Sequence, residues 1–123
     1  MNTNIVIVPI DPREIVKSAG LDVDLPVTAR AAIEGEELLA VWGLAWSPGR
    51  CWLWLHVERS EPKHAFTVIR EAKRMLKRAA QLGETEVYTP RDASRETSAN
   101  LLKLVGFEFF AVENGTEVFI WRV

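Results

Sequence analysis

The segment SANLLKLVGFEFF, residues 98–110, has the pattern of a helix that ends at a glycine and passes directly into an aromatic strand. Its apolar side chains recur at helical spacing and so share one face: Leu101, Leu102 and Val105. Gly106 suits the left-handed backbone position at which helices commonly end. The segment therefore predicts an amphipathic helix within 92–105 and a strand over 107–113.

A hairpin follows this segment at the end of the chain. Asn114 and Gly115 form the dipeptide that is favoured in two-residue hairpin turns, because both turn positions need positive φ. The residues after the turn predict a strand over 116–123 that pairs with the strand before it.

The strongest helical pattern in the chain lies upstream, between Ser60 and Gly83. Its apolar positions recur at helical spacing: Ala65, Val68, Ile69, Ala72, Met75, Leu76, Ala79 and Leu82. Ser60 can cap the start of this helix, Pro62 lies in its first turn, and Gly83 ends it. The residues that follow, 84–89, predict a strand.

The N-terminal half predicts four short strands, over 5–9, 28–33, 38–46 and 51–57. The last of these, CWLWLHV, is apolar on both alternating faces, which favours a place in the middle of a sheet. A brief helix begins at Asp11 and Pro12 and stops at Gly20. The predicted order is therefore β-α-β-β-β-α-β-α-β-β.

The composition is that of an ordinary globular domain of 123 residues, with 48% hydrophobic and 26% charged residues. A net charge of −2 gives no global basic field that would attract nucleic acid. Cys51 is the single cysteine, so an internal disulfide is excluded, and with only His56 and His64 beside it we expect no metal site. The first apolar run lacks a basic leader and no stretch approaches the ~20 apolar residues of a membrane span, so we expect a cytoplasmic protein.

The order and spacing of these elements resemble the GCN5-related N-acetyltransferase (GNAT) superfamily, over roughly residues 28–123. AAIEGEELLAVWGLAW and CWLWLHV are similar to the family's second to fourth strands. SANLLKLVGFEFF and the closing hairpin are similar to its last helix and last two strands. The resemblance implies an α/β (α+β) fold, in which a mixed, mostly antiparallel twisted sheet of about six to seven strands is flanked by three helices. It also implies a single domain over 1–123, with a shortened N-terminal helical region at 11–27.

The resemblance further implies a site for acetyl-CoA at the start of the long helix. The family holds the coenzyme pyrophosphate with a Gly-rich loop, whose backbone N–H groups lie at the positive end of that helix. Here the loop has no glycine, Pro62 lacks an N–H group, and Glu58 and Glu61 add negative charge. Nearby cationic or donor groups can offset this charge: Arg59, Lys63 and His64. The residues implied to contact the coenzyme are Leu55, Val57, Arg59, Lys63, His64, Ala65 and Phe66.

Two residues are candidates for the catalytic general base. His56 lies near the end of the central strand and Glu58 follows it, and histidine titrates near neutral pH, which suits proton transfer. His56 can equally be a hydrogen-bonded core histidine, and Glu58 a solvated loop carboxylate. Leu102 stands about where many family members have the tyrosine that protonates the departing thiolate, so the resemblance leaves the enzyme's chemistry incomplete.

Two functions follow from the resemblance. One is a GNAT-like acyl-CoA-binding protein that acts as an N-acetyltransferase. The other is a catalytically inactive GNAT-fold module for binding or assembly. The short N-terminal helical region, the substituted loop and Leu102 also resemble small phage-encoded GNAT-like proteins, which implies a virion-associated location as the alternative to the cytoplasm.

Aromatic and basic side chains define two predicted surfaces. Two tryptophans share parity on each of two neighbouring strands, so we expect one aromatic cluster on one sheet face: Trp42, Trp46, Trp52 and Trp54. Where such a face is exposed it would contact a second copy or an assembly partner, and core packing is the alternative. The long helix carries a basic stripe: Arg70, Lys73, Arg74, Lys77 and Arg78. We expect a solvated helix face rather than a nucleic-acid site, because no aromatics interleave with the stripe.

Overall fold

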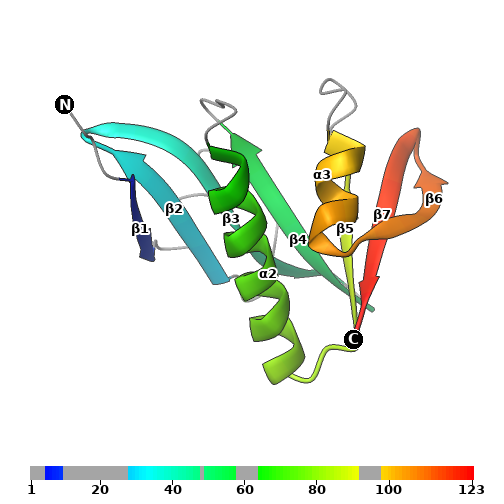
Figure 1. Cartoon of the computed structure of the whole chain (residues 1–123). Coiled ribbons are helices and arrows are strands. Elements are labelled where there is room, and N and C mark those ends of the chain that lie inside the picture. Colours follow the sequence, from blue (N-terminus) through cyan, green and yellow to red (C-terminus); the bar gives the residue numbers. More distant parts are fainter. Residues whose placement is uncertain (1–4, 10–27, 48, 58–63, 92–97) are drawn as a thin grey trace.

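The computed structural model describes residues 5–9, 28–47, 49–57, 64–91 and 98–123 (Figure 1). Seven strands lie in these ranges: β1 (Ile5–Pro9), β2 (Thr28–Glu34), β3 (Glu37–Ser47), β4 (Arg50–Val57), β5 (Glu86–Pro90), β6 (Glu108–Glu113) and β7 (Thr116–Arg122). Two helices accompany them: α2 (Ala65–Gln81) and α3 (Ser98–Val105). The order of these elements along the chain is the predicted one.

All seven strands form one sheet in the order β1-β2-β3-β4-β5-β7-β6. Neighbouring strands are antiparallel except β4 and β5, which run parallel. A parallel pair needs a crossover connection, and the segment that contains α2 provides it. The sheet is therefore mixed and mostly antiparallel, and the predicted fold class is confirmed.

Both helices cover the same face of the sheet (Figure 1), and the main core lies between these two layers. The apolar stripe of α2 meets alternate side chains of the central strands, because successive strand residues point to opposite faces. Buried residues at this interface come from β3, β4 and α2: Trp42, Leu44, Cys51, Leu53, Met75, Leu76 and Ala79. The central position predicted for β4 is confirmed by the sheet order.

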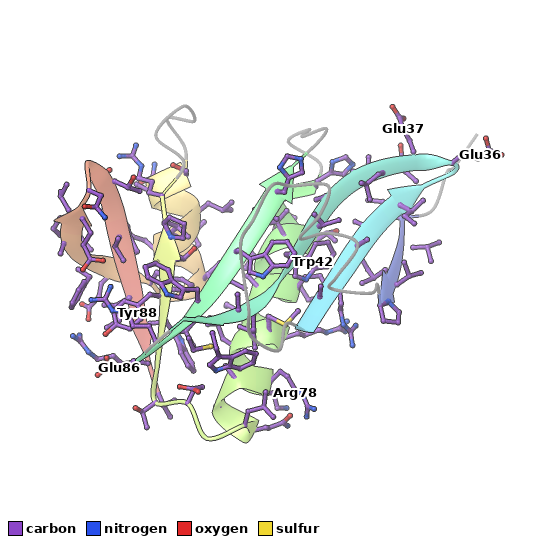
Figure 2. All side chains as sticks on the ribbon, turned by 180° about the vertical axis from the view of Figure 1, so that it is seen from behind. Glu36, Glu37, Trp42, Arg78, Glu86 and Tyr88 are labelled. Atoms are coloured by element: carbon purple, nitrogen blue, oxygen red, sulfur yellow. The ribbon has the colours of Figure 1, made fainter. Side chains whose placement is uncertain are left out.

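The opposite face of the sheet, seen in Figure 2, carries two smaller apolar clusters. One lies on β2 and β3 and includes Val41, with Trp54 packed against it. The other lies on β5 and β7 and includes Tyr88 and Ile120, with Trp52 packed against it. Strand β4 thus contributes apolar side chains to both faces, as its sequence predicted.

The tryptophans lie on both faces of the sheet, so the prediction of a single aromatic cluster is wrong. Trp42 and Trp46 pack on the helix side, whereas Trp52 and Trp54 pack on the other side. The physical reason is the register of the β3–β4 hairpin, which places Gly43, and not a tryptophan, opposite Trp54. All five tryptophans of the chain are buried or half-buried, and the partner surface predicted from them stays a prediction.

Two predicted turn positions have the expected backbone conformation. Asn114 has a φ of 52° and Gly115 a φ of 80°, which confirms the hairpin turn between β6 and β7. Gly83 has a φ of 96° directly after the C-cap residue Leu82, which confirms the predicted end of α2.

Two of the three expected helices, α2 and α3, lie in the described residues. The first expected helix, within 11–27, lies outside the described residues, as does the 92–97 part of the last one. The single domain over 1–123 stays a prediction. Within the ranges that the structure describes, neither helix has the length and apolar character needed to cross a bilayer.

Candidate functional site

Strands β4 and β5 pair at a single point. The register joins Trp52 to Tyr88, with no further β4–β5 residue pair in the described ranges. By contrast, β3 accompanies β4 along the whole of Arg50–Val57. Figure 1 shows β4 and β5 running apart from their shared point toward their carboxyl ends, beside the start of α2. The carboxyl half of β4 therefore has backbone groups that β5 does not pair.

The start of α2 has no capping side chain at its N-cap residue, His64, and no acidic side chain in its first turn. The N–H groups of a first helical turn have no partner within the helix and carry the positive end of the helix dipole. Such an end favours an anionic ligand, above all phosphate or carboxylate.

His64 connects the start of α2 to the end of β2. Its side chain is buried, and the Nε2 atom has no hydrogen-bond partner. The Oε2 atom of Glu34 lies 4.0 Å from this nitrogen. Buried polar atoms are normally paired, so an unpaired one indicates a place where a ligand, an ion or a water would be stabilising.

Four of the predicted coenzyme contacts meet His64 at this junction of β4 and α2. The side chain of Leu55 is 48% exposed and that of Phe66 is 86% exposed, so both are open to a ligand. Val57 ends β4 and Ala65 begins α2, which places their backbone groups at the same end of the sheet (Figure 1). Five of the seven predicted contact residues thus lie near the end of β4 or at the start of α2, and their role as coenzyme contacts stays a prediction.

The candidate bases are placed less favourably. His56 is exposed, but its side chain lies on the sheet face opposite to α2. Successive strand residues point to opposite faces, and His56 pairs with Val41, which belongs to the apolar cluster on that face. Glu58 lies outside the described residues, as do the coenzyme contacts predicted at Arg59 and Lys63. Their roles stay predictions.

Leu102 lies on α3 and is half-buried against the main core. It packs there as an ordinary apolar residue, so α3 keeps its place in the fold without the family's tyrosine. A leucine cannot donate a proton, and this position therefore supplies no general acid.

The sequence does not predict a cluster that surrounds Arg50, the first residue of β4. Its guanidinium donates two hydrogen bonds, at 2.6 and 3.0 Å, to the carboxylate of Glu113 on β6. The guanidinium carbon lies 4.4 Å from the ring centre of Tyr88, 5.5 Å from that of Phe110 and 5.7 Å from that of Trp52. We call these five residues the Arg50 clamp. They come from three strands, so only the sheet register, and no sequence spacing, could have indicated them.

The Arg50 clamp changes the acid–base properties of its members. Hydrogen bonds from Arg50 lower the pKa of Glu113, and the same bonds raise the pKa of Arg50. The Tyr88 hydroxyl donates a hydrogen bond of 2.8 Å to Glu86, a neighbour on β5 (Figure 2), which together with burial raises the pKa of Tyr88. At neutral pH the clamp therefore contains a cation, a carboxylate and a neutral phenol.

Other ionisable groups of the described residues have local explanations. Glu71 on α2 is 2% exposed and accepts a hydrogen bond of 3.1 Å from Arg74. The basic stripe of α2 is exposed along its length, as expected for a solvated face. Burial raises the pKa of Cys51 to about 12, so the thiol stays protonated near neutral pH. In the part of the chain that the structure describes, no three histidine, cysteine, aspartate or glutamate side chains gather as metal ligands would.

No protein-family model matches the sequence, and no curated protein matches it. Solved structures do match. The IAA acetyltransferase from Bacillus cereus has a TM-score of 0.69 at 18% identity, over 98% of this chain and 100% of that chain. A Bacillus subtilis acetyltransferase in complex with CoA has a TM-score of 0.68 at 17% identity, over 98% and 99%. A GNAT family acetyltransferase from Elizabethkingia anophelis with acetyl-CoA bound has a TM-score of 0.66 at 12% identity, over 99% and 100%. The chain therefore has the fold of the GNAT acetyltransferases.

Proposed function

We propose that this protein is a GNAT-like N-acyltransferase that binds acetyl-CoA between the carboxyl halves of β4 and β5 and transfers the acyl group to an amine. The observation that carries the proposal is the single β4–β5 residue pair, Trp52↔Tyr88. Beyond it, backbone N–H and C=O groups of β4 are left unmatched by β5. An extended amide chain, such as the arm of the coenzyme, can hydrogen-bond to such groups as an added strand does.

The start of α2 fits the phosphate groups of the coenzyme. The first turn has no acidic side chain, and a helix start favours an anion through its N–H groups and its dipole. The buried Nε2 atom of His64 has no hydrogen-bond partner and can donate to an anion when it is protonated. In this proposal the backbone of Leu55–Val57 holds the thioester and Lys63–Phe66 surround the pyrophosphate. When it is bound, the coenzyme supplies the activated acyl group.

The protein's own contribution is mainly to hold the reactants. Correct positioning can lower a barrier by about 7–11 kcal/mol, whereas one general acid typically accelerates a reaction only ~10²–10⁴-fold. The leucine at position 102 therefore slows the proposed reaction without abolishing it. His56 and Glu58 remain the proposed bases, with His56 acting on the amine through a water molecule.

One observation favours a second function, a catalytically inactive GNAT-fold module for binding or assembly, such as a component of a phage particle. The carboxylate of Glu34 lies 4.0 Å from Nε2 of His64 and is largely buried. A carboxylate in this place competes with a phosphate for His64 and repels the phosphate, and burial of both side chains strengthens that repulsion.

Calorimetric titration with acetyl-CoA tests whether the coenzyme binds. We expect saturable binding with a Kd on the order of micromolar. Phe66→Glu adds a negative charge to the first turn of α2 through an exposed side chain, and it should weaken binding about tenfold or more. An acidic residue near a helix start favours the helix, so this loss would not come from unfolding.

Gln81→Glu is the matched control, because it adds the same charge to the last turn of the same helix. It should leave the affinity for acetyl-CoA within about twofold of wild type, since the helix-dipole and charge effects fall off with distance. A wild-type protein that shows no heat of binding at millimolar acetyl-CoA would overturn the acyltransferase and leave the binding module.

Turnover then separates the two functions. With a panel of primary amines, the acyltransferase should release the free coenzyme thiol in an amine-dependent manner, and His56→Gln should lower the rate by ~10²-fold or more. Binding of acetyl-CoA without thiol release in the presence of any amine would favour the inactive module.

A further inference from the structure

The Arg50 clamp lies at the one point where β4 and β5 meet. Trp52 and Tyr88, which form the single β4–β5 residue pair, supply two of the three rings around the guanidinium. The third ring, Phe110, and the carboxylate of Glu113 both come from β6. The Arg50 side chain of β4 therefore contacts β5 and β6 across a junction that has only one backbone residue pair.

The clamp has the geometry of an oriented network. The ring centre of Tyr88 lies 5.7 Å from that of Trp52 and 5.2 Å from that of Phe110, and the Tyr88 and Phe110 rings meet edge to face. The faces of such rings attract a cation such as the Arg50 guanidinium. The Arg50–Glu113 pair is bidentate, which fixes direction as well as distance. The two side chains are 29% and 35% exposed, so water is partly excluded from both.

We propose that Arg50 is a positioning residue, which fastens β4 to β5 and β6 at their meeting point and thereby sets how far the carboxyl halves of β4 and β5 stand apart. The inference rests on the proposed function in one respect, because the space between those halves is where we place the arm of acetyl-CoA. Backbone pairing joins the two strands at one residue pair, so it constrains this separation less than a full ladder would, and side chains can contribute to it.

Arginine is required for this role because of its planar fork. Lysine would keep a cation over the rings but lose the second hydrogen bond to Glu113 and the stacking surface. Methionine would keep much of the apolar stem and lose both the charge and the hydrogen bonds. We therefore expect the effects of substitution to increase from Arg50→Lys to Arg50→Met.

Hydrogen–deuterium exchange of the free protein tests the clamp without coenzyme. In Arg50→Met we expect the amides next to the β4–β5 residue pair, those of residues 52–53 and 88–89, to exchange about three- to tenfold faster than in wild type, with Arg50→Lys in between. The amides of residues 28–34, on the other side of the sheet, should be unchanged. Exchange that accelerates evenly in all strands would overturn the proposal, because it would indicate a loss of global stability only.

Arg122→Met is the matched control. It removes one arginine from β7. The guanidinium of Arg122 donates a hydrogen bond of 2.7 Å to the carboxylate of Glu108 on β6, and both side chains are exposed. The change in charge equals that of Arg50→Met, and the substitution lies in the hairpin that the clamp contacts. We expect wild-type exchange rates for the amides of residues 52–53 in this variant.

The affinity for acetyl-CoA provides the functional readout. Arg50→Met should raise the Kd and the KM about three- to tenfold, in proportion to the faster exchange, and leave kcat within about twofold, because Arg50 holds strands and does not touch reacting atoms. Arg50→Lys should recover part of the lost affinity.

The two proposals fail in different ways. If wild type does not bind acetyl-CoA but Arg50→Met still accelerates exchange in β4 and β5 alone, the proposed function falls and the positioning of the strands by Arg50 stands. If wild type binds and Arg50→Met equals Arg122→Met in both exchange and affinity, the positioning role is overturned.

Discussion

The β3–β4 and β4–β5 junctions of the sheet are built in different ways. Strand β4 pairs with β3 along its whole length in antiparallel register. Its backbone pairs with β5 at Trp52↔Tyr88, where the side chains of the Arg50 clamp add to the connection. The comparison teaches that one sheet can contain a junction fixed by its backbone and another whose geometry depends on a few side chains. The β3–β4 junction should open only when the protein unfolds, whereas substitution of a side chain can change the separation of β4 and β5.

The largest effect is expected in the β3–β4 junction. Leu44 is fully buried and pairs with Leu53, so Leu44→Ala should lower the free energy of unfolding by about 2–5 kcal/mol. Urea denaturation measures this loss. Leu38→Ala, at a 40% exposed position of the same strand, is the control and should lose less than about 1 kcal/mol. Equal losses in the two variants would contradict the central place of this junction in the core.

A second prediction concerns the attachment of α3 to the strands beyond β5. Gly106 has a φ of 116°, and a Cβ atom there would lie 3.3 Å from Cδ1 of Trp121 on β7. Gly106→Ala should therefore lower the free energy of unfolding by about 1–3 kcal/mol, from backbone strain and from displacement of the indole. Thermal denaturation measures it. Gly83→Ala, with a φ of 96° and nothing within 4 Å of the added atom, should lose less. The reverse ranking would show that Trp121 moves aside freely.

Tyr88→Phe sharpens the comparison at the β4–β5 junction itself. It removes the hydroxyl that donates to Glu86 and keeps the ring beneath Arg50. We expect the free energy of unfolding to fall by about 0.5–1.5 kcal/mol, while the exchange rates of β4 amides stay at wild-type values. Tyr88→Leu, which removes the ring, should raise those rates. If Tyr88→Phe raised them as much as Tyr88→Leu, the hydroxyl rather than the ring would hold the junction.

The smallest effect is expected from acid. Hydrogen bonds from Arg50 lower the pKa of Glu113 in the folded protein, so its unfolded pKa is the higher of the two. The contribution to stability is then present above the unfolded pKa, about 4.3, and is lost as pH falls through the folded pKa. The free energy of unfolding should thus fall more steeply below about pH 5 in wild type than in Glu113→Gln. The difference should shrink in about 1 M salt, and parallel curves at low salt would exclude an energetic role for the pair.

The order of the strands and the long helix could be predicted because hydrophobic periodicity is a local property of the sequence. The apolar spacing of α2 and the two apolar faces of β4 both led to the correct elements. The register between strands is not local, and a shift by one residue moves every side chain to the other face. This is why the expected grouping of Trp42 and Trp46 with Trp52 and Trp54 was wrong.

The candidate site shows the same division. Leu55 and Phe66 could be placed together from the sequence, because a short connection joins the end of β4 to the start of α2. The approach of Glu34 to His64 and the pairing of Arg50 with Glu113 could not, since each joins residues that are distant in the chain. The charges that surround the start of α2 could therefore be identified only in the folded structure.

The crossover between β4 and β5 also has a kinetic consequence. The hairpins β3–β4 and β6–β7 close through short turns, whereas Trp52 meets Tyr88 only after a long loop that includes α2 has closed. The entropy lost in closing such a loop precedes any gain from the contact, so we expect the hairpins to form early and this junction to form late. Substitutions in the Arg50 clamp should then accelerate unfolding more than they slow refolding.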